Sequence, residues 1–119
     1  AELSVYIDKA CLRCGVGKAL YSALIEILQV QNVRNVYGCV TVPNENSEKL
    51  HEYFGFKKLG VYHSTGYKCG AWHDVAWFEK AIGDYGPDPR PFMSIQGIDT
   101  NAITEILDRY KIFCHSLRL

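Results

Sequence analysis

The most constraining feature of this chain is a strand-forming stretch that leads, through two glycines, into an amphipathic helix. Val5, Tyr6 and Ile7 are β-branched or aromatic and favour a strand over residues 2–8. Apolar side chains then recur at helical spacing over about residues 15–31, at Val16, Ala19, Leu20, Ala23, Leu24, Ile27 and Leu28. Gly15 and Gly17 let backbone N–H groups approach a ligand closely, and a helix start carries partial positive charge. The turn therefore suits a phosphate or pyrophosphate group.

Two glycines at a strand-to-helix turn are also compatible with ordinary turn formation, so this signal is weak by itself. The sequence excludes two common phosphate loops. It contains no G-x-x-x-x-G-K-[ST] segment, and the third glycine of a dinucleotide-binding G-x-G-x-x-G would fall at Leu20. A loop that binds phosphate through its backbone amides remains, and so does a purely structural turn.

A second strand and a second helix follow. Residues 36–42 predict a strand that runs parallel to the first, because a helix connects the two. Asn44 or Asn46 can cap the next helix, which we expect to run to Phe54. Gly55 supplies the left-handed conformation that commonly ends a helix.

Two further strands complete the predicted sheet. Residues 57–63 and 72–81 predict a hairpin, and its turn contains Gly66 and Gly70. The order strand, helix, strand, helix, strand, strand indicates an α/β fold with a mixed β-sheet flanked by helices.

The end of the chain has a different composition. We expect a domain over residues 1–82, a linker rich in glycine and proline over 83–99, and a tail with a short helix over 100–119. Apolar residues at i, i+3, i+4 and i+7 predict that helix over about 100–111, with Asp99 or Thr100 as its cap.

Charge and cysteine content exclude several classes of protein. Thirteen basic and thirteen acidic residues cancel, so bulk charge gives no case for nucleic acid or an anionic membrane as a partner. No segment reaches membrane-spanning length, and no signal peptide is visible. Five irregularly spaced cysteines argue against a disulfide framework and favour the cytoplasm. Cys11 and Cys14 lack the second close pair that a zinc site needs, so we expect no metal.

Several segments, in order, resemble the GNAT N-acetyltransferases, and more narrowly the branch that acetylates phosphinothricin and methionine sulfoximine. That branch carries E-x-[ST]-V-Y-[VI], a pyrophosphate loop, N-x-x-S-x-x-L-H-E-x-x-G-F and then G-x-W-H-D-V. The matching segments here are Glu2–Ile7, the turn around Gly15, Asn44–Phe56 and Gly70–Val75. Their order and spacing agree over residues 2 to about 80.

The chain also departs from the family pattern. Leu12 stands where the family has Arg or Gln, Arg13 where a small residue is frequent, and Cys14 where a basic or polar side chain is usual. The resemblance starts at the family's fourth strand, so its first three strands and first two helices have no counterpart here. We therefore expect the C-terminal part of a GNAT fold.

The resemblance implies two catalytic residues. Glu2 matches the general base that takes a proton from the acceptor ammonium, and the alternative for Glu2 is an exposed charge at a chain end. His51 stands where many relatives carry a tyrosine thought to protonate the leaving sulfur. The alternative for His51 is a structural helix histidine.

The resemblance also implies binding residues. Acetyl-CoA would contact the backbone of Val5, Tyr6 and Ile7, the loop formed by Leu12, Arg13, Cys14, Gly15, Val16, Gly17 and Lys18, and the side chain of Asn46. For Asn46 the alternative is an ordinary helix cap. The acceptor pocket would include Tyr6, Trp72 and His73, for which the alternative is packing in the core.

The implied reaction is direct transfer of acetyl from acetyl-CoA to the α-amino group of a small amino acid analogue, with no covalent enzyme intermediate. Phosphinothricin and methionine sulfoximine or sulfone are substrates of the resembled branch. A hypothesis from a different class is a truncated, inactive module that binds CoA or a protein partner. We also expect a homodimer, because an apolar strand edge at Leu3–Ile7 invites pairing.

Overall fold

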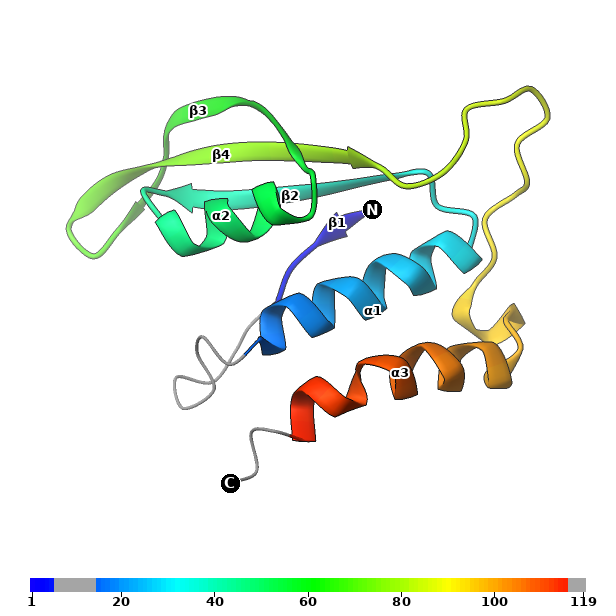
Figure 1. The fold of residues 1–119 in the computed structure, drawn as a ribbon. Coiled ribbons are helices and arrows are strands. Elements are labelled where there is room, and N and C mark those ends of the chain that lie inside the picture. The colour runs from blue at the N-terminus through cyan, green and yellow to red at the C-terminus, as the bar shows by residue number, and fades with distance from the viewer. Residues whose placement is uncertain (6–14, 116–119) are drawn as a thin grey trace. The chain divides into compact units, whose positions relative to one another are not determined.

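The computed structural model describes residues 1–5 and 15–115, with side chains as far as residue 111 (Figure 1). These residues belong to two compact units, which we call the strand unit (Ala1–Ser4 and Asn35–Ala81) and the helix unit (Val5–Arg34 and Ile82–Leu119). The elements, in chain order, are β1 (Glu2–Leu3), α1 (Val16–Val30), β2 (Asn35–Val42), α2 (Glu45–Tyr53), β3 (Lys57–Lys68), β4 (Ala71–Ala81), the 3₁₀ turn η2 (Ile95–Gly97) and α3 (Thr100–His115). The predicted order of elements is confirmed.

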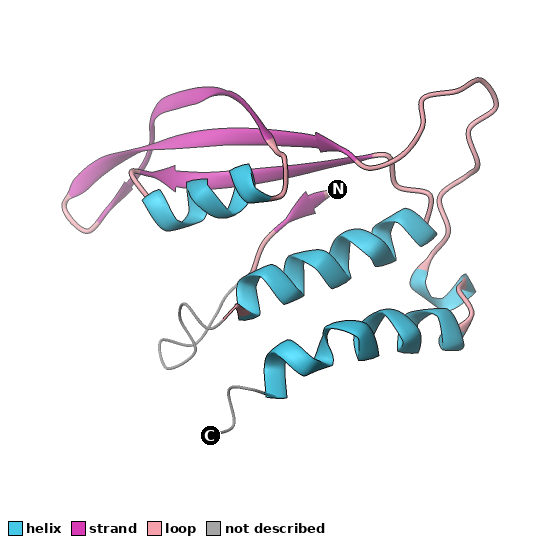
Figure 2. Cartoon of the chain, in the orientation of Figure 1, coloured by secondary structure: helices cyan, strands magenta, loops and turns pink. Residues whose placement is uncertain are grey.

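The strand unit is a four-stranded mixed sheet in the order β1-β2-β4-β3, with α2 on one face (Figure 2). β1 and β2 are parallel, as the connecting helix predicts, and β4 is antiparallel to β2 and β3. The core contains the buried side chains of Leu3, Val36, Val40, His51, Phe56, Ala76 and Phe78. The predicted α/β class with a mixed sheet is therefore correct.

The predicted first strand is shorter than expected. The sequence favours residues 2–8, whereas β1 contains only Glu2 and Leu3, and Ser4 and Val5 lie outside any strand. Residues 6–8 are outside the described part of the chain. Leu3, opposite Gly38, is the last described residue of this segment that pairs with β2.

The hairpin is longer than expected, and its turn is tighter. Cys69 and Gly70 form the connection, both at positive φ (53° and 78°), so the expectation that Gly66 lies in the turn is wrong. Gly66 instead pairs with His73 inside the ladder. The register shifts between Tyr62 and Gly66, and this irregularity interrupts the alternation of side chains. The strand pattern in the sequence therefore ends before the strand itself does.

In the helix unit, α1 and α3 lie side by side and run in opposite directions (Figure 1). Ala23 and Ile106 are buried, and the Arg109 guanidinium donates to both carboxylate oxygens of Glu26 at 2.8 and 2.9 Å. The tail helix runs to His115, about one turn beyond its predicted end. Asp99 caps it by accepting a hydrogen bond from the N–H of Asn101 at 3.0 Å.

Side chains after α1 hold the segment that follows β4. The Arg34 guanidinium donates to the carbonyls of Asp84 and Arg90, and the Gln31 amide donates to the carbonyl of Met93 at 3.1 Å. The N–H of Met93 returns a bond to the Gln31 carbonyl at 2.9 Å. These donors order a segment whose glycine and proline content predicts a linker. The division at residues 82 and 99 stays a prediction.

Candidate functional site

The candidate site starts where β1 and β2 stop pairing. Glu2 is opposite Tyr37 and Leu3 is opposite Gly38, whereas β2 continues for four more residues to Val42. Among the described residues, the β1 side of Cys39–Val42 has no strand partner. Backbone groups along such an open edge can bind an extended ligand through strand-like hydrogen bonds.

His51 lies at the point where the pairing stops. Its side chain enters the core from α2, it is 3% exposed, and its ring stacks on Phe78 with centroids 4.9 Å apart. The ring also meets Phe56 edge-on at 5.0 Å. An alanine Cβ at Gly38 would lie 2.2 Å from His51 Nε2, so this nitrogen lies directly over the last β2 residue that pairs with β1.

One hydrogen bond fixes the His51 tautomer. Nδ1 lies 2.7 Å from the backbone carbonyl oxygen of Ser47. Because a carbonyl can only accept, Nδ1 carries the hydrogen, and in the neutral ring Nε2 is then the acceptor. His51 can act as an acid at Nε2 only after it takes up a second proton.

Glu2 lies on the opposite face of the sheet from His51. Side chains alternate along a strand, so Glu2 shares the face of its partner Tyr37 and of Cys39, whereas Leu3 and Gly38 face α2. The pKa of the Cys39 thiol is raised by partial burial and, second, by the Glu2 carboxylate, which agrees with this placement. A carboxylate and an imidazole thus flank the end of the β1–β2 pairing from two faces.

The glycine turn starts α1 in the helix unit. Gly15 is the N-cap at φ 80°, and a Cβ there would meet nothing within 4 Å. Neither a capping side chain nor an acidic residue occupies the first turn of α1. Such a helix start fits an anion, because its backbone N–H groups point outward with partial positive charge. Leu12, Arg13 and Cys14, together with Tyr6 and Ile7, lie outside the described residues.

Of the two asparagines that could cap α2, the structure uses Asn44. The Asn44 side chain accepts from the N–H of Ser47 at 3.2 Å, so Asn44 is the cap. Asn46 lies in the first turn and is exposed, which contradicts the alternative that it is the helix cap. Its role as a contact for acetyl-CoA stays a prediction.

Trp72 and His73 are the second and third residues of β4, next to the turn of the hairpin. Trp72 is 64% exposed and meets Tyr67 of β3 in a T-shaped contact with centroids 5.3 Å apart, so packing in the core does not account for it. His73 Nε2 lies 2.9 Å from the carbonyl oxygen of Lys68 across the hairpin. Whether either side chain contacts an acceptor stays a prediction.

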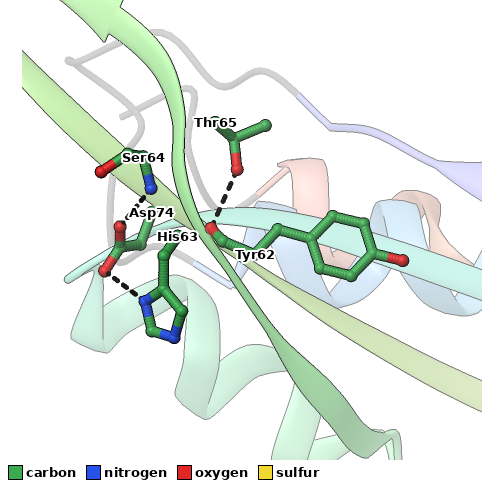
Figure 3. Close-up of polar contacts among 5 residues, drawn as sticks. All are labelled: Tyr62, His63, Ser64, Thr65 and Asp74. Carbon is green, nitrogen blue, oxygen red and sulfur yellow. Dashed lines mark hydrogen bonds and ion pairs between the residues drawn. The ribbon is translucent and has the colours of Figure 1, made fainter.

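A polar cluster on the hairpin was not predicted from sequence (Figure 3). Three residues of β3, His63 to Thr65, stand opposite the single residue Asp74 of β4. The Asp74 carboxylate accepts from the N–H of Ser64 at 2.7 Å and lies 3.3 Å from His63 Nδ1. These contacts hold the pKa of Asp74 below its usual value, the Ser64 bond being the largest cause. A glycine two residues after Ser64 in a strand pattern was the available signal of a bulge.

In the described part of the chain, no group of three or more His, Cys, Asp or Glu side chains could hold a metal ion. None of the helices described has the length and apolar character needed to cross a bilayer.

Comparison with known proteins identifies the relatives of this arrangement. Residues 1–77 match the family described as acetyltransferase (GNAT) domain. An N-acetyltransferase of Streptomyces griseus is 42% identical over 88 residues, which are 74% of this chain and 45% of that protein. A phosphinothricin N-acetyltransferase of Streptomyces coelicolor is 36% identical over 68% of this chain and 47% of its own length.

A solved structure shares the fold. The GNAT superfamily phosphinothricin acetyltransferase of Sinorhizobium meliloti, crystallised with acetyl-CoA, superposes with a TM-score of 0.69 at 29% identity. The superposition covers 78% of this chain and 50% of that one. The chain thus spans about half the length of the curated relatives it matches.

Proposed function

Because this chain belongs to the acetyltransferase (GNAT) domain family, we propose that it transfers an acetyl group from acetyl-CoA to the α-amino group of a small amino acid analogue. The names of the relatives support phosphinothricin, and by chemical likeness methionine sulfoximine or sulfone, as the acceptor class. The observation that carries the proposal is the end of the β1–β2 pairing, with Glu2 on one face of the sheet and His51 on the other.

Acetyl-CoA, when bound, supplies an activated acyl group as a thioester. Glu2 accepts a proton from the acceptor ammonium, directly or through a water molecule, which leaves a neutral nitrogen able to attack the carbonyl carbon. As the C–N bond forms, negative charge develops on the carbonyl oxygen, and the backbone N–H groups of Val5 to Ile7 donate to it. When the C–S bond breaks, His51 in its doubly protonated form gives the Nε2 proton to the thiolate.

The two faces give these residues separate tasks. The base must reach the incoming amine, whereas the acid must reach the departing sulfur on the other side of the carbonyl carbon. The placement of the two residues supports these roles: Leu3 and Gly38 face α2, which carries His51, whereas Glu2 points to the other face of the sheet. His51 also needs its ring held in position, which the bond from Nδ1 to Ser47 and the stacking on Phe78 provide.

We assign the pyrophosphate of CoA to the start of α1. The loop from Leu12 to Lys18 would hold it through backbone N–H groups, and the conformation of Gly15 and the absence of acidic residues in the first helical turn support this assignment. Asn46 would contact the cofactor through its exposed side-chain amide. Tyr6, Trp72 and His73 would line the pocket for the acceptor.

The proposal extends to assembly and location. A homodimer is supported by aromatic side chains exposed on the β3–β4 hairpin, where Tyr62, Tyr67 and Trp72 are each more than 60% exposed. The free thiols of Cys39 and Cys69 suit the reducing cytoplasm. Light scattering after size exclusion tests the dimer, and a species of 13.5 kDa at micromolar concentration would refute it.

The decisive assay measures thiol release from acetyl-CoA by the chain, with methionine sulfoximine as acceptor, beside calorimetric binding of CoA. We expect acceptor-dependent release that falls by about 10²–10⁴ in Glu2→Gln, with CoA affinity unchanged. Glu45→Gln, an exposed carboxylate of α2, is the matched control and should behave as wild type. Binding of CoA without turnover in the wild-type chain would refute catalysis and support an inactive CoA-binding module.

A further inference from the structure

A surface cleft at the C-terminal end of α1 has no part in the reaction described above. It has a volume of about 360 Å³, within the range of small-molecule sites, and all of its lining residues belong to the helix unit. One wall is the end of α1 with the residues that follow it. The other wall is the segment after β4, which lies beyond the match to the acetyltransferase domain. We propose that this cleft binds a large apolar α-amino acid in its zwitterionic form.

Side-chain hydrogen bonds hold the two walls of the cleft together. The segment after β4 folds back along the end of α1 (Figure 1). The Gln29 amide donates to the Ile82 carbonyl at 3.1 Å. The Asn32 amide donates to the Pro91 carbonyl at 2.9 Å, and the Arg34 guanidinium donates to two further carbonyls of the segment. Because these bonds already order the walls, a ligand can bind the cleft at a low entropic cost.

Arg34 and Arg90 supply the positive charge of the cleft. Arg34 donates from Nε to the Asp84 carbonyl and from both Nη atoms to the Arg90 carbonyl, and Nη1 also donates to the Asn32 carbonyl. Nε thus uses its one hydrogen, Nη1 uses both of its hydrogens and Nη2 uses one of two. The other Nη2 hydrogen has no acceptor among the described residues. Since neither arginine forms an ion pair with a described carboxylate, both charges suit the carboxylate of a ligand.

Asp84 and Asp88 supply the matching negative charge. Both residues line the cleft and are exposed, and neither carboxylate has a hydrogen-bond or ion-pair partner in the part of the chain that the structure describes. An ammonium group carries three hydrogens, so it can donate to more than one carboxylate oxygen. No group of three or more potential metal ligands occurs among the described residues, so the two carboxylates suit an ammonium better than a metal ion.

The balance of charge selects the class of ligand. Two basic and two acidic side chains line the same cleft, so a simple anion would meet two carboxylates and a simple cation would meet two guanidinium groups. A zwitterion instead offers each pair a group of the opposite sign. In an α-amino acid the ammonium and the carboxylate are attached to one carbon, which suits charged residues as close in sequence as Asp88 and Arg90.

The apolar part of the lining selects the side chain of the ligand. The residues that supply it are Val33, Ile82, Pro87 and Pro89. Exposed ion pairs contribute little by themselves, whereas an apolar side chain that is buried against these residues adds affinity. A volume of about 360 Å³ is more than a small aliphatic side chain fills, so we expect an aromatic amino acid to bind well.

The test is a calorimetric titration of the full chain with L-phenylalanine, in the absence of acetyl-CoA. We expect a dissociation constant in the millimolar range or tighter. N-acetyl-L-phenylalanine lacks the ammonium and L-phenylalanine methyl ester lacks the carboxylate, so each should bind at least about fivefold more weakly. Glycine keeps both charges without an apolar side chain and should bind at least about tenfold more weakly.

Matched variants locate the binding. Asp88→Asn and Arg90→Gln should each weaken the binding of L-phenylalanine by at least about fivefold, because each removes one charged partner of the ligand. Asp108→Asn and Lys111→Gln remove the same charges from exposed positions of α3 that lie outside the cleft, and they should leave the affinity unchanged.

The outcomes are independent of the proposed function. If Asp88→Asn and Arg90→Gln bind L-phenylalanine as tightly as wild type, the ligand binds elsewhere and the inference is wrong. Equal affinity for L-phenylalanine and its N-acetyl or ester derivative would overturn the assignment of a zwitterion. A wild-type chain that does not bind L-phenylalanine would overturn the inference outright. Acetyl transfer is tested separately, by thiol release from acetyl-CoA, and none of these results bears on it.

Discussion

The imidazole of His51 occupies the space that any side chain at Gly38 would need. A Cβ on Gly38 would lie 2.2 Å from His51 Nε2 and 2.6 Å from Cδ2, distances that real Cβ contacts do not show. Since Gly38 is also the last β2 residue that pairs with β1, the glycine and the histidine together define the end of that pairing. The absence of a side chain at position 38 is thus what allows the imidazole to reach the candidate site.

Gly38→Ala should destabilise the chain by about 1–3 kcal/mol, because the added methyl forces the buried ring of His51 to move. Urea unfolding with linear extrapolation measures this change. Gly60→Ala is the matched control, since a Cβ at this other strand glycine would meet nothing within 4 Å. It should change stability by less than about 0.5 kcal/mol.

The double variant Gly38→Ala with His51→Ala identifies the cause. Removing the imidazole makes room for the methyl, so the two changes together should cost less than the sum of the single changes, by about 0.5–3 kcal/mol. Simple additivity would mean that the alanine clashes with something other than His51.

Asp74→Asn should flatten the acid end of the pH–stability profile. The pKa of Asp74 in the folded chain is lowered from its usual value of 3.8 by the Ser64 N–H and then by His63. Its contribution to stability is therefore fully present above about pH 4 and is lost as the pH falls through the lowered pKa. Unfolding measured from about pH 5 to pH 2 should show a shallower loss for Asp74→Asn than for wild type.

Asp88→Asn supplies the comparison for that experiment. Among the described residues, the Asp88 side chain has no hydrogen-bond or ion-pair partner, so this variant should keep the wild-type slope. Equal slopes for all three proteins would show that the Asp74 contacts do not persist in solution.

Sequence patterns predicted the elements well but only part of the buried side of α1. The spacing of apolar residues selects Leu20 and Leu24, yet Tyr21 is 5% exposed and Ile25 is 7% exposed, whereas Leu20 is 40% exposed. Ala19, Ala23 and Leu28 of the predicted stripe are buried, and the buried side is turned so that it also includes Tyr21 and Ile25. The neighbours of the helix decide which side is buried, and periodicity does not contain that information.

The candidate site shows the same limit. Glu2 and His51 were selected by resemblance, but their placement on opposite faces depends on the register of Leu3 with Gly38, which no local pattern specifies. The contact of Asp74 with Ser64 likewise joins two strands across a bulge. Local features such as the Asn44 cap and the Gly55 helix stop were predictable, because each depends only on its immediate neighbours in sequence.

Gly15→Val should weaken CoA binding by more than tenfold, at least about 1.4 kcal/mol, because a β-branched residue does not tolerate φ 80° and its side chain obstructs the amides at the start of α1. Gly70→Val is a close control. Gly70 has φ 78°, and a Cβ there would also meet nothing within 4 Å, so the backbone strain is the same but lies in the β3–β4 turn. Calorimetry should show unchanged CoA affinity for Gly70→Val. An equal loss in both variants would attribute the effect to general destabilisation rather than to the loop.

Glu2→Gln should make Cys39 more reactive toward iodoacetamide at pH 8. Partial burial is the main cause that raises the pKa of the Cys39 thiol, and the Glu2 carboxylate is the second, so removing that charge lowers the pKa and increases the fraction of thiolate. Mass spectrometry of the digested protein follows alkylation of each cysteine, with Cys69 in the hairpin turn as the internal control that should not respond. The difference should shrink in high salt, because ions screen the carboxylate from the thiol. If Cys39 reacts at the same rate in both proteins, the Glu2 carboxylate does not act on the Cys39 thiol, and this support for placing Glu2 on the same face of the sheet is lost.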